Sequence, residues 1–240
     1  MPVSISLAQT SLAVIILGSS VGTYIALSPP NPSSSSTVPS TGDSIRWLNL
    51  ANKHTTKIAL APLGLLALHT SCLTYFHPSI PPFILRHGAE NNLNTKLITW
   101  SAATSIPLAL VFCCGIPLRL ISHTSLGKNF TFTLAEPDRL TTTGVYRYVQ
   151  HPSYTGLVVL IVCNVALLGR MDGVLSCWFR SSWYQILTTT EWIAAPIGLS
   201  MLLFGIWTRV REEEGMLHDK FAFNWEKWHV STARLIPWMS

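Results

Sequence analysis

Five long apolar stretches constrain the fold of this chain more than any other feature. They lie at roughly Leu7–Leu27, Lys57–Phe76, Leu97–Leu118, Tyr154–Leu168 and Trp192–Trp207. A helix needs about 20 apolar residues, at about 1.5 Å each, to cross the hydrocarbon core of a bilayer. Because a backbone exposed to lipid must satisfy its own hydrogen bonds, such stretches form helices. The sequence therefore predicts an all-α integral membrane protein with about five transmembrane helices.

The composition agrees with a membrane protein and argues against several other classes. Only 11% of the 240 residues are charged, whereas soluble domains carry about 25%. The net charge of +5 comes from basic residues dispersed among the apolar stretches. No basic block or recognition motif indicates nucleic acid. Four of the five cysteines lie inside the apolar stretches, and no Cys/His spacing is typical of a metal or redox site. We therefore expect contact with a lipid bilayer, no nucleic acid and no metal.

The distribution of Lys and Arg predicts the orientation in the membrane. One side receives the larger set, which comprises Arg46, Lys53, the Arg119–Arg147 loop and the basic C-terminal tail. The other side receives Arg86, Lys96, Arg170 and Arg180. Because cytoplasmic loops carry the excess of basic residues, we expect the first side to be cytosolic. The first apolar stretch has no basic residue before it and is longer than the 7–15 residues of a signal-peptide core, so we expect it to be retained as a span.

Composition also suggests a division of the chain. A Ser/Pro-rich stretch at residues 28–42 is typical of a flexible connector. We expect residues 1–121 to hold three N-terminal transmembrane helices and this linker. Residues 122–240 are expected to form a second part with helices four and five, a polar loop at the cytosolic face and a C-terminal interfacial helix.

Two polar segments flank the last two apolar stretches on the predicted cytosolic side. Residues 144–156 precede the fourth stretch and read GVYRYVQHPSYTG; residues 209–217 follow the fifth and read RVREEEGML. Taken singly, each is explained as well by anchoring as by a binding site. Pro152 suits the first turn of a helix, tyrosines suit the membrane interface, and exposed ion pairs contribute little. Two such segments at one face indicate a site.

An aromatic segment continues the second motif toward the C-terminus. Leu217, Phe221, Trp225 and Trp228 recur at helical spacing, and they form an apolar stripe suited to lying on a membrane surface. Within the motif, Arg209 and Glu213 are four residues apart, so a helix places them side by side.

These paired motifs resemble the isoprenylcysteine carboxyl methyltransferase family and its membrane phospholipid-methyltransferase relatives. The similarity runs from Leu126 to Pro237 and includes HPSYTG, RVREEEGML and an aromatic helix that ends at RLIP. This sequence departs from the family at a few positions. Gln150 stands where the family usually has Arg, Ala222 where it usually has Gly, and Trp225 and Trp228 where it usually has Tyr.

The resemblance implies a methyltransferase that depends on S-adenosyl-L-methionine and methylates the C-terminal carboxylate of isoprenylated cysteine. Prenylated CaaX-type proteins or small prenylcysteine compounds are the implied substrates, at the cytosolic face of the endoplasmic reticulum membrane. No oligomeric state is predicted. Arg209 is expected to face the substrate carboxylate, with Glu213 beside it as the second catalytic residue. The residues implied to contact the cofactor are Asp138, Arg139, Leu140, Thr141, Tyr146, His151, Pro152, Ser153, Tyr154 and Glu213.

The chemistry of the reaction agrees with these residue types. A carboxylate is already ionised at pH 7, so its methylation needs alignment of the reacting atoms rather than a strong base. Alignment can contribute up to roughly 7–11 kcal/mol. A guanidinium such as that of Arg209 holds a carboxylate through two parallel hydrogen bonds. Glu213 can orient Arg209 and accept a hydrogen bond from the ammonium group of the cofactor.

Three other functions remain compatible with the sequence. A lipid-amine methyltransferase of the phosphatidylethanolamine type shares the motifs, although an amine substrate gives Arg209 no carboxylate to hold. An NADPH-dependent enzyme resembling sterol reductases shares the His-Pro-x-Tyr motif and an aromatic helix near the C-terminus. A membrane scaffold without catalytic activity is favoured only by Gln150.

Overall fold

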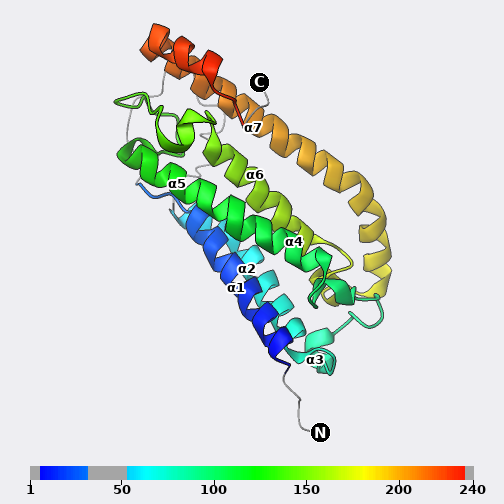
Figure 1. Ribbon diagram of the computed structural model, residues 1–240. Helices are drawn as coiled ribbons and strands as arrows, with labels where there is room; N and C mark the ends of the chain where they lie inside the picture. The colour runs from blue at the N-terminus through cyan, green and yellow to red at the C-terminus, as the bar shows by residue number, and fades with distance from the viewer. Residues whose placement is uncertain (1–5, 32–52, 236–240) are drawn as a thin grey trace. The chain divides into compact units, whose positions relative to one another are not determined.

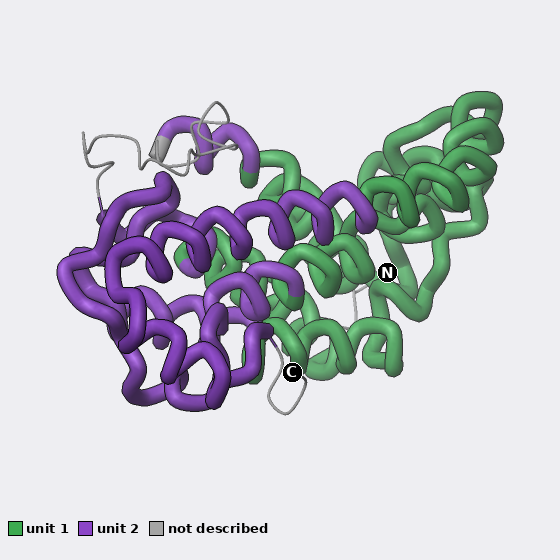
Figure 2. Tube along the Cα trace, turned by 90° about the horizontal axis from the view of Figure 1, so that it is seen from above, with its two compact units in different colours: residues 1–25, 60–114, 159–198 green, residues 26–59, 115–158, 199–240 purple. Residues whose placement is uncertain are grey.

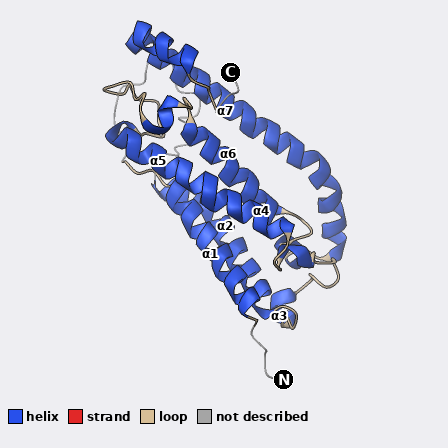
Figure 3. Cartoon of the chain, in the orientation of Figure 1, coloured by secondary structure: helices blue, strands red, loops and turns tan. Residues whose placement is uncertain are grey.

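The computed structural model describes residues 6–31 and 53–235 (Figure 1). Most of the predicted 28–42 linker, Arg46 and Pro237 lie outside these residues. Within the described part, the chain forms helices joined by loops and contains no strand (Figure 3). The segments long and apolar enough to cross a membrane are Leu7–Leu27, His54–Phe76, Thr95–Asn129, Pro152–Cys177 and Ser181–Ser231. The predicted all-α fold with about five spans is therefore confirmed.

The helices follow one another along the chain in the order expected from the apolar pattern. They are α1 (Leu7–Leu27), α2 (Lys53–Phe76), the short α3 (Pro82–Leu85), α4 (Ala102–Leu110), α5 (Ile116–Leu126), α6 (Pro152–Asn164) and α7 (Ser181–Ser231). A π-helical turn at Val111–Gly115 joins α4 to α5 without a break. The third candidate span therefore continues through α5 to Asn129.

The chain divides into two compact units (Figure 2). The first comprises residues 1–25, 60–114 and 159–198. Its described part is built around apolar side chains of α1, α2, α4 and the end of the fourth span, which include Leu12, Ile16, Ala67, Leu108, Leu167 and Leu168. Because lipid is as apolar as these side chains, close packing of the helices stabilises the unit here, and not the removal of apolar surface from water. Neither polar motif falls in this unit.

The second unit comprises residues 26–59, 115–158 and 199–240 and contains both polar motifs. Its core cluster joins the loop before α6 to the C-terminal part of α7, and it contains Leu134, Met216, Leu217 and Trp225, with Leu140, Phe221 and Trp228 packed against them. The predicted apolar stripe on α7 therefore packs in part within the protein, with Leu217 and Trp225 buried and Phe221 and Trp228 partly buried against them. Leu134 and Leu140 of the loop pack against the stripe, a contact that the spacing of residues in the sequence could not predict.

Helix α7 changes direction at Ala222, where φ is 40° and ψ is −115°. A side chain rarely adopts this backbone conformation, whereas glycine adopts it readily. The position is the one where the related family usually has Gly. The usual glycine is thus explained by the backbone conformation of the bend, and Ala222 carries local strain.

Replacing Ala222 by Gly is expected to stabilise the protein. Backbone strain of this kind costs about 1–3 kcal/mol, and glycine loses roughly 0.5–1 kcal/mol through its larger unfolded-state entropy. The net gain in free energy of unfolding should be about 1 kcal/mol, measured by thermal unfolding in lipid nanodiscs. Ala195→Gly is the matched control, since Ala195 has ordinary helical geometry in α7, and it should destabilise. A lower melting temperature for Ala222→Gly would contradict the strain at this bend.

Candidate functional site

Gly156 sets the close packing of α6 against α5. A Cβ atom at this position would lie 3.0 Å from the carbonyl oxygen of Gly115 and 3.1 Å from Cγ of Arg119. A Cβ atom there would require these neighbours to move by a few tenths of an ångström, so glycine favours the close approach. One turn earlier in α6, the Ser153 hydroxyl accepts a hydrogen bond from Nη1 of Arg119. The HPSYTG motif therefore holds a buried arginine of α5 in place.

His151 lies between two glutamates of α7. Its side chain is buried, with Nδ1 3.8 Å from Oε2 of Glu213 and Nε2 3.6 Å from Oε1 of Glu214. These separations exceed hydrogen-bond length, so the attraction is electrostatic and depends on protonation of the ring. Helix α6 begins at Pro152, as predicted. The structure thus brings the two motifs together within one unit.

Arg209 is buried and held by groups on both sides. Its Nη2 donates to the carbonyl oxygen of Phe132 at 2.9 Å, and its Nη1 lies 3.7 Å from Oε2 of Glu212. The Tyr154 side chain lies close to both Arg209 and Glu213. The side chain of Glu213 is 30% exposed, against 7% for Glu214. Glu213 is therefore the more accessible carboxylate of the pair that faces His151.

The C-terminal segment is tied to the turn before α6. The backbone N–H groups of Gln150 and His151 donate to the carbonyl oxygens of Ala233 and Arg234, at 2.8 and 3.0 Å. The buried Gln150 side chain donates through Nε2 to two further carbonyl oxygens, those of His229 and Thr232. A side-chain amide both donates and accepts, and Oε1 of Gln150 also lies 2.9 Å from Nδ1 of His229. Gln150 has a structural role here.

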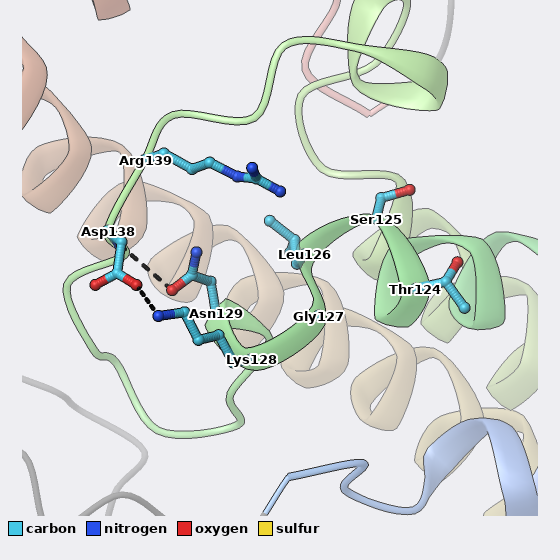
Figure 4. A pocket seen from close by; sticks show the side chains of 8 residues that line it. All are labelled: Thr124, Ser125, Leu126, Gly127, Lys128, Asn129, Asp138 and Arg139. Atoms are coloured by element: carbon cyan, nitrogen blue, oxygen red, sulfur yellow. Dashed lines mark hydrogen bonds and ion pairs between the residues drawn. The ribbon is translucent and has the colours of Figure 1, made fainter.

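The loop residues predicted to contact the cofactor are more dispersed. Asp138 pairs with Lys128 at 2.6 Å, and the hydrogen bond from Lys128 lowers the pKa of this carboxyl. Asp138 and Arg139 line a cavity of about 370 Å³ together with Thr124, Ser125, Leu126, Gly127, Lys128 and Asn129 (Figure 4). Its lining does not include His151, Tyr154 or Glu213. These two predicted residues are therefore not part of the cluster around His151.

The remaining predicted residues have a mixed environment. Leu140 packs against the apolar cluster of the second unit, while the buried Thr141 hydroxyl has no hydrogen-bond partner among the described residues. Tyr146 is buried next to α6, and its carbonyl oxygen accepts from Nε1 of Trp228 at 2.9 Å. Burial raises the pKa of Tyr146, so its phenol is neutral at physiological pH.

Four residues of this region were missed by the sequence reasoning. Arg119 was predicted to begin a loop, but it lies in α5 with only 4% of its surface exposed. A lone arginine in the apolar run IPLRLI is itself a signal, because an ionisable residue within a span usually has a function. Gln150, Glu214 and Arg234 have no such local signal. Arg234 contributes a cation whose Nε lies 3.0 Å from Oε1 of Glu214.

Comparisons with known proteins show which family the sequence resembles. Residues 107–183 match the model of the isoprenylcysteine carboxyl methyltransferase (ICMT) family. The resemblance indicated by the motifs is confirmed. A 116-residue region is 28% identical to a protein-S-isoprenylcysteine O-methyltransferase of Dictyostelium discoideum, covering 40% of this chain and 49% of that relative. The chain thus matches about half the length of the relative, and no solved structure matches it.

We predict that Gln150→Leu loosens the C-terminal segment. The substitution leaves the carbonyl oxygens of His229 and Thr232 without their donor, and an unsatisfied buried group costs about 1–3 kcal/mol. Thermal unfolding and limited trypsin digestion at Lys227 and Arg234 would measure the effect. Gln185→Leu, at an exposed position of α7, is the control and should change neither. Equal trypsin resistance of the Gln150 variant and wild type would show that the amide does not hold this segment.

Proposed function

We propose that this protein is a methyltransferase that depends on S-adenosyl-L-methionine and methylates the carboxylate of isoprenylated cysteine at a membrane. The observation that carries the proposal is the meeting of His151 and Tyr154 with Arg209 and Glu213 in one unit. The family match over residues 107–183 supports it, since these residues include the HPSYTG motif. The name of the Dictyostelium relative supports the substrate class.

The residues present fit such a cofactor. Polar side-chain atoms are rarely buried without a hydrogen-bond partner, yet Thr141 Oγ1 and Trp225 Nε1 of this unit have none among the described residues, and His151 Nε2 has only its ion-pair contact with Glu214. A ligand rich in hydrogen-bonding groups would satisfy atoms of this kind. Glu213 offers a partly exposed carboxylate to an ammonium group, and Tyr154 an aromatic ring beside it. The cofactor, when bound, supplies a methyl group activated by a positively charged sulfur.

The residues of this chain would bind and orient the carboxylate that receives the methyl group. Arg209 has a fixed position because Phe132 and Glu212 hold its two terminal nitrogens. A guanidinium fixed in this way can present a planar pair of donors to a carboxylate. Because the nucleophile is already ionised, none of these residues has to remove a proton. Burial of Arg209 and His151 keeps bulk water away from the reacting atoms.

A membrane location suits a prenylated substrate. Moving a chain of about fifteen carbons from lipid into water costs on the order of 10 kcal/mol. An enzyme whose site lies at the end of its spans leaves that chain in lipid. The helix that carries Arg209 has exposed apolar residues shortly before it, with Trp207 two and Phe204 five residues earlier. We propose the cytosolic face of the endoplasmic reticulum membrane as the location.

Methyl transfer tests the proposal directly. Membranes that contain the protein should move label from methyl-labelled S-adenosylmethionine to N-acetyl-S-farnesylcysteine, and the product should release its label in base, as a methyl ester does. Arg209→Ala should lower kcat/KM by about 10- to 100-fold, since a hydrogen bond to a charged group contributes about 1.5–3 kcal/mol. Binding of the cofactor without methyl transfer to the prenylcysteine would indicate that the substrate is a lipid amine. Failure to bind the cofactor would reject the proposal and favour NADPH.

The role of Glu213 can be tested by binding alone. Glu213→Gln removes the negative charge that faces the ammonium group, so S-adenosylmethionine should bind about tenfold more weakly. 5′-Methylthioadenosine lacks the amino-acid moiety and should bind wild type and variant equally. Glu136→Gln is the control, because Glu136 is exposed and pairs with Lys220 at 3.2 Å. Equal weakening of both ligands would indicate a general structural effect of the Glu213 substitution.

A further inference from the structure

Asn31, just beyond the C-terminal end of α1, is hydrogen-bonded to the loop that follows α5. Its Nδ2 donates to the carbonyl oxygens of Gly127 and Phe130, each at 2.8 Å. A side-chain amide nitrogen carries two N–H donors, so both are used on this loop. Pro29 and Pro30 join α1 to Asn31, and because proline fixes φ, this connection has little freedom. Asn31 is therefore well placed to hold the start of the loop.

The loop depends on such an anchor because it has no regular secondary structure of its own. It runs from the 3₁₀ turn at Gly127–Asn129 to the next one at Gly144–Arg147, and no residue between these turns belongs to a helix or a strand. Its backbone position therefore depends on side-chain contacts. Phe130, the second residue that Asn31 holds, is buried, and its ring centroid lies 4.2 Å from that of His123 in α5. The start of the loop is thus held by the Asn31 amide and by packing on α5.

The same loop carries the carbonyl oxygen that orients Arg209. The ring centroids of Phe130 and Phe132 lie 5.8 Å apart, edge to face. The carbonyl oxygen of Phe132 accepts a hydrogen bond from Nη2 of Arg209 at 2.9 Å. Because Arg209 is buried, the direction of its guanidinium depends on the groups that contact it. A continuous series of contacts within the second unit thus runs from Asn31 to Arg209.

We propose that Asn31 is a positioning residue for substrate binding, which keeps Arg209 directed at the carboxylate of the prenylcysteine. The inference rests on the proposed function, in which Arg209 holds that carboxylate. Two parallel N–H groups must meet the two carboxylate oxygens, and a shift of the Phe132 carbonyl would turn the guanidinium away from this alignment. Asn31 lies outside residues 107–183, which match the family model. The segment after the first span thus takes part in substrate binding, although it belongs to neither polar motif.

Equilibrium binding to the full chain in lipid nanodiscs tests the inference, with N-acetyl-S-farnesylcysteine and its methyl ester as the two ligands. Wild type should bind the acid more tightly, because the ester offers no carboxylate to Arg209. Asn31→Leu has a similar size but no donor. It should reduce the preference for the acid by about 3- to 10-fold, the range expected for the loss of a neutral hydrogen bond. Affinity for the ester should stay unchanged, since only the carboxylate contact is misaligned.

Asn91→Leu is the matched control. Nδ2 of Asn91 also donates to two carbonyl oxygens, those of Ser176 and Phe179, each at 2.8 Å, but in the first unit. This variant should lower the melting temperature and leave the preference for the acid unchanged. Asn31→Asp keeps the shape of Asn31 and removes both donors, so it should lose at least as much preference as Asn31→Leu and serves in its place if the Leu variant does not fold. Asn31→Gln keeps the amide and should recover part of the preference.

The possible results separate the inference from the proposed function. If wild type prefers the acid, the inference is overturned when the Asn31 variants keep the full preference. It is also overturned when they weaken acid and ester equally, because that result shows a general structural role. If wild type binds acid and ester equally, Arg209 holds no carboxylate, and the inference fails together with this part of the proposed function.

Discussion

The backbone pairing of Gln150 and His151 with Ala233 and Arg234 is the interaction on which the candidate site depends. The two motifs lie about sixty residues apart, and this pairing fixes the C-terminal segment beside the start of α6. Buried backbone N–H groups require acceptors, so the contact is strongly favoured once the segment docks. The bend at Ala222 contributes to this contact, because the end of α7 changes direction there. Glu213 and Glu214 then face His151.

Pairs of opposite charges hold the polar side chains of the candidate site in position. Glu214 faces His151 and Arg234, and Arg209 faces Glu212. Such buried pairs are costly to break, since removing one partner leaves the other uncompensated. They also hold the polar groups in fixed orientations before a ligand binds, which is the condition for electrostatic stabilisation of a reaction. Arg119 is the exception within the described cluster, because its hydrogen bonds go to the carbonyl oxygen of Ala26 and the hydroxyl of Ser153.

The spans and the start of α6 could be predicted from the sequence, because they depend on residues close together in the chain. The spans follow from the local density of apolar residues, and the start of α6 at Pro152 follows from a local preference. The proximity of His151 to Glu213 was implied by the family resemblance alone. The apolar pattern placed the end of the third span at Leu118, one residue before Arg119, whereas α5 continues to Leu126.

Other features depend on contacts between distant segments. Gln150 looked like the loss of a positive charge, but its amide suits two carbonyl oxygens and a histidine ring that come from α7 and the segment after it. The stripe of Leu217 and Trp225 has the spacing of a membrane-facing helix, and only the loop residues Leu134 and Leu140 show that it is buried in the protein. The division near residue 121 and the assigned catalytic and cofactor roles stay predictions.

Photochemical labelling with methyl-labelled S-adenosylmethionine would test the central claim most directly, because it reports where the cofactor lies. Ultraviolet irradiation of the full chain in membranes, followed by peptide mapping, should place the label in the segment that contains His151 and Tyr154 or in the one that contains Arg209 and Glu213. Excess S-adenosylhomocysteine should suppress it. Label confined to the cavity of Lys128 and Arg139, or label that the competitor does not reduce, would contradict the account.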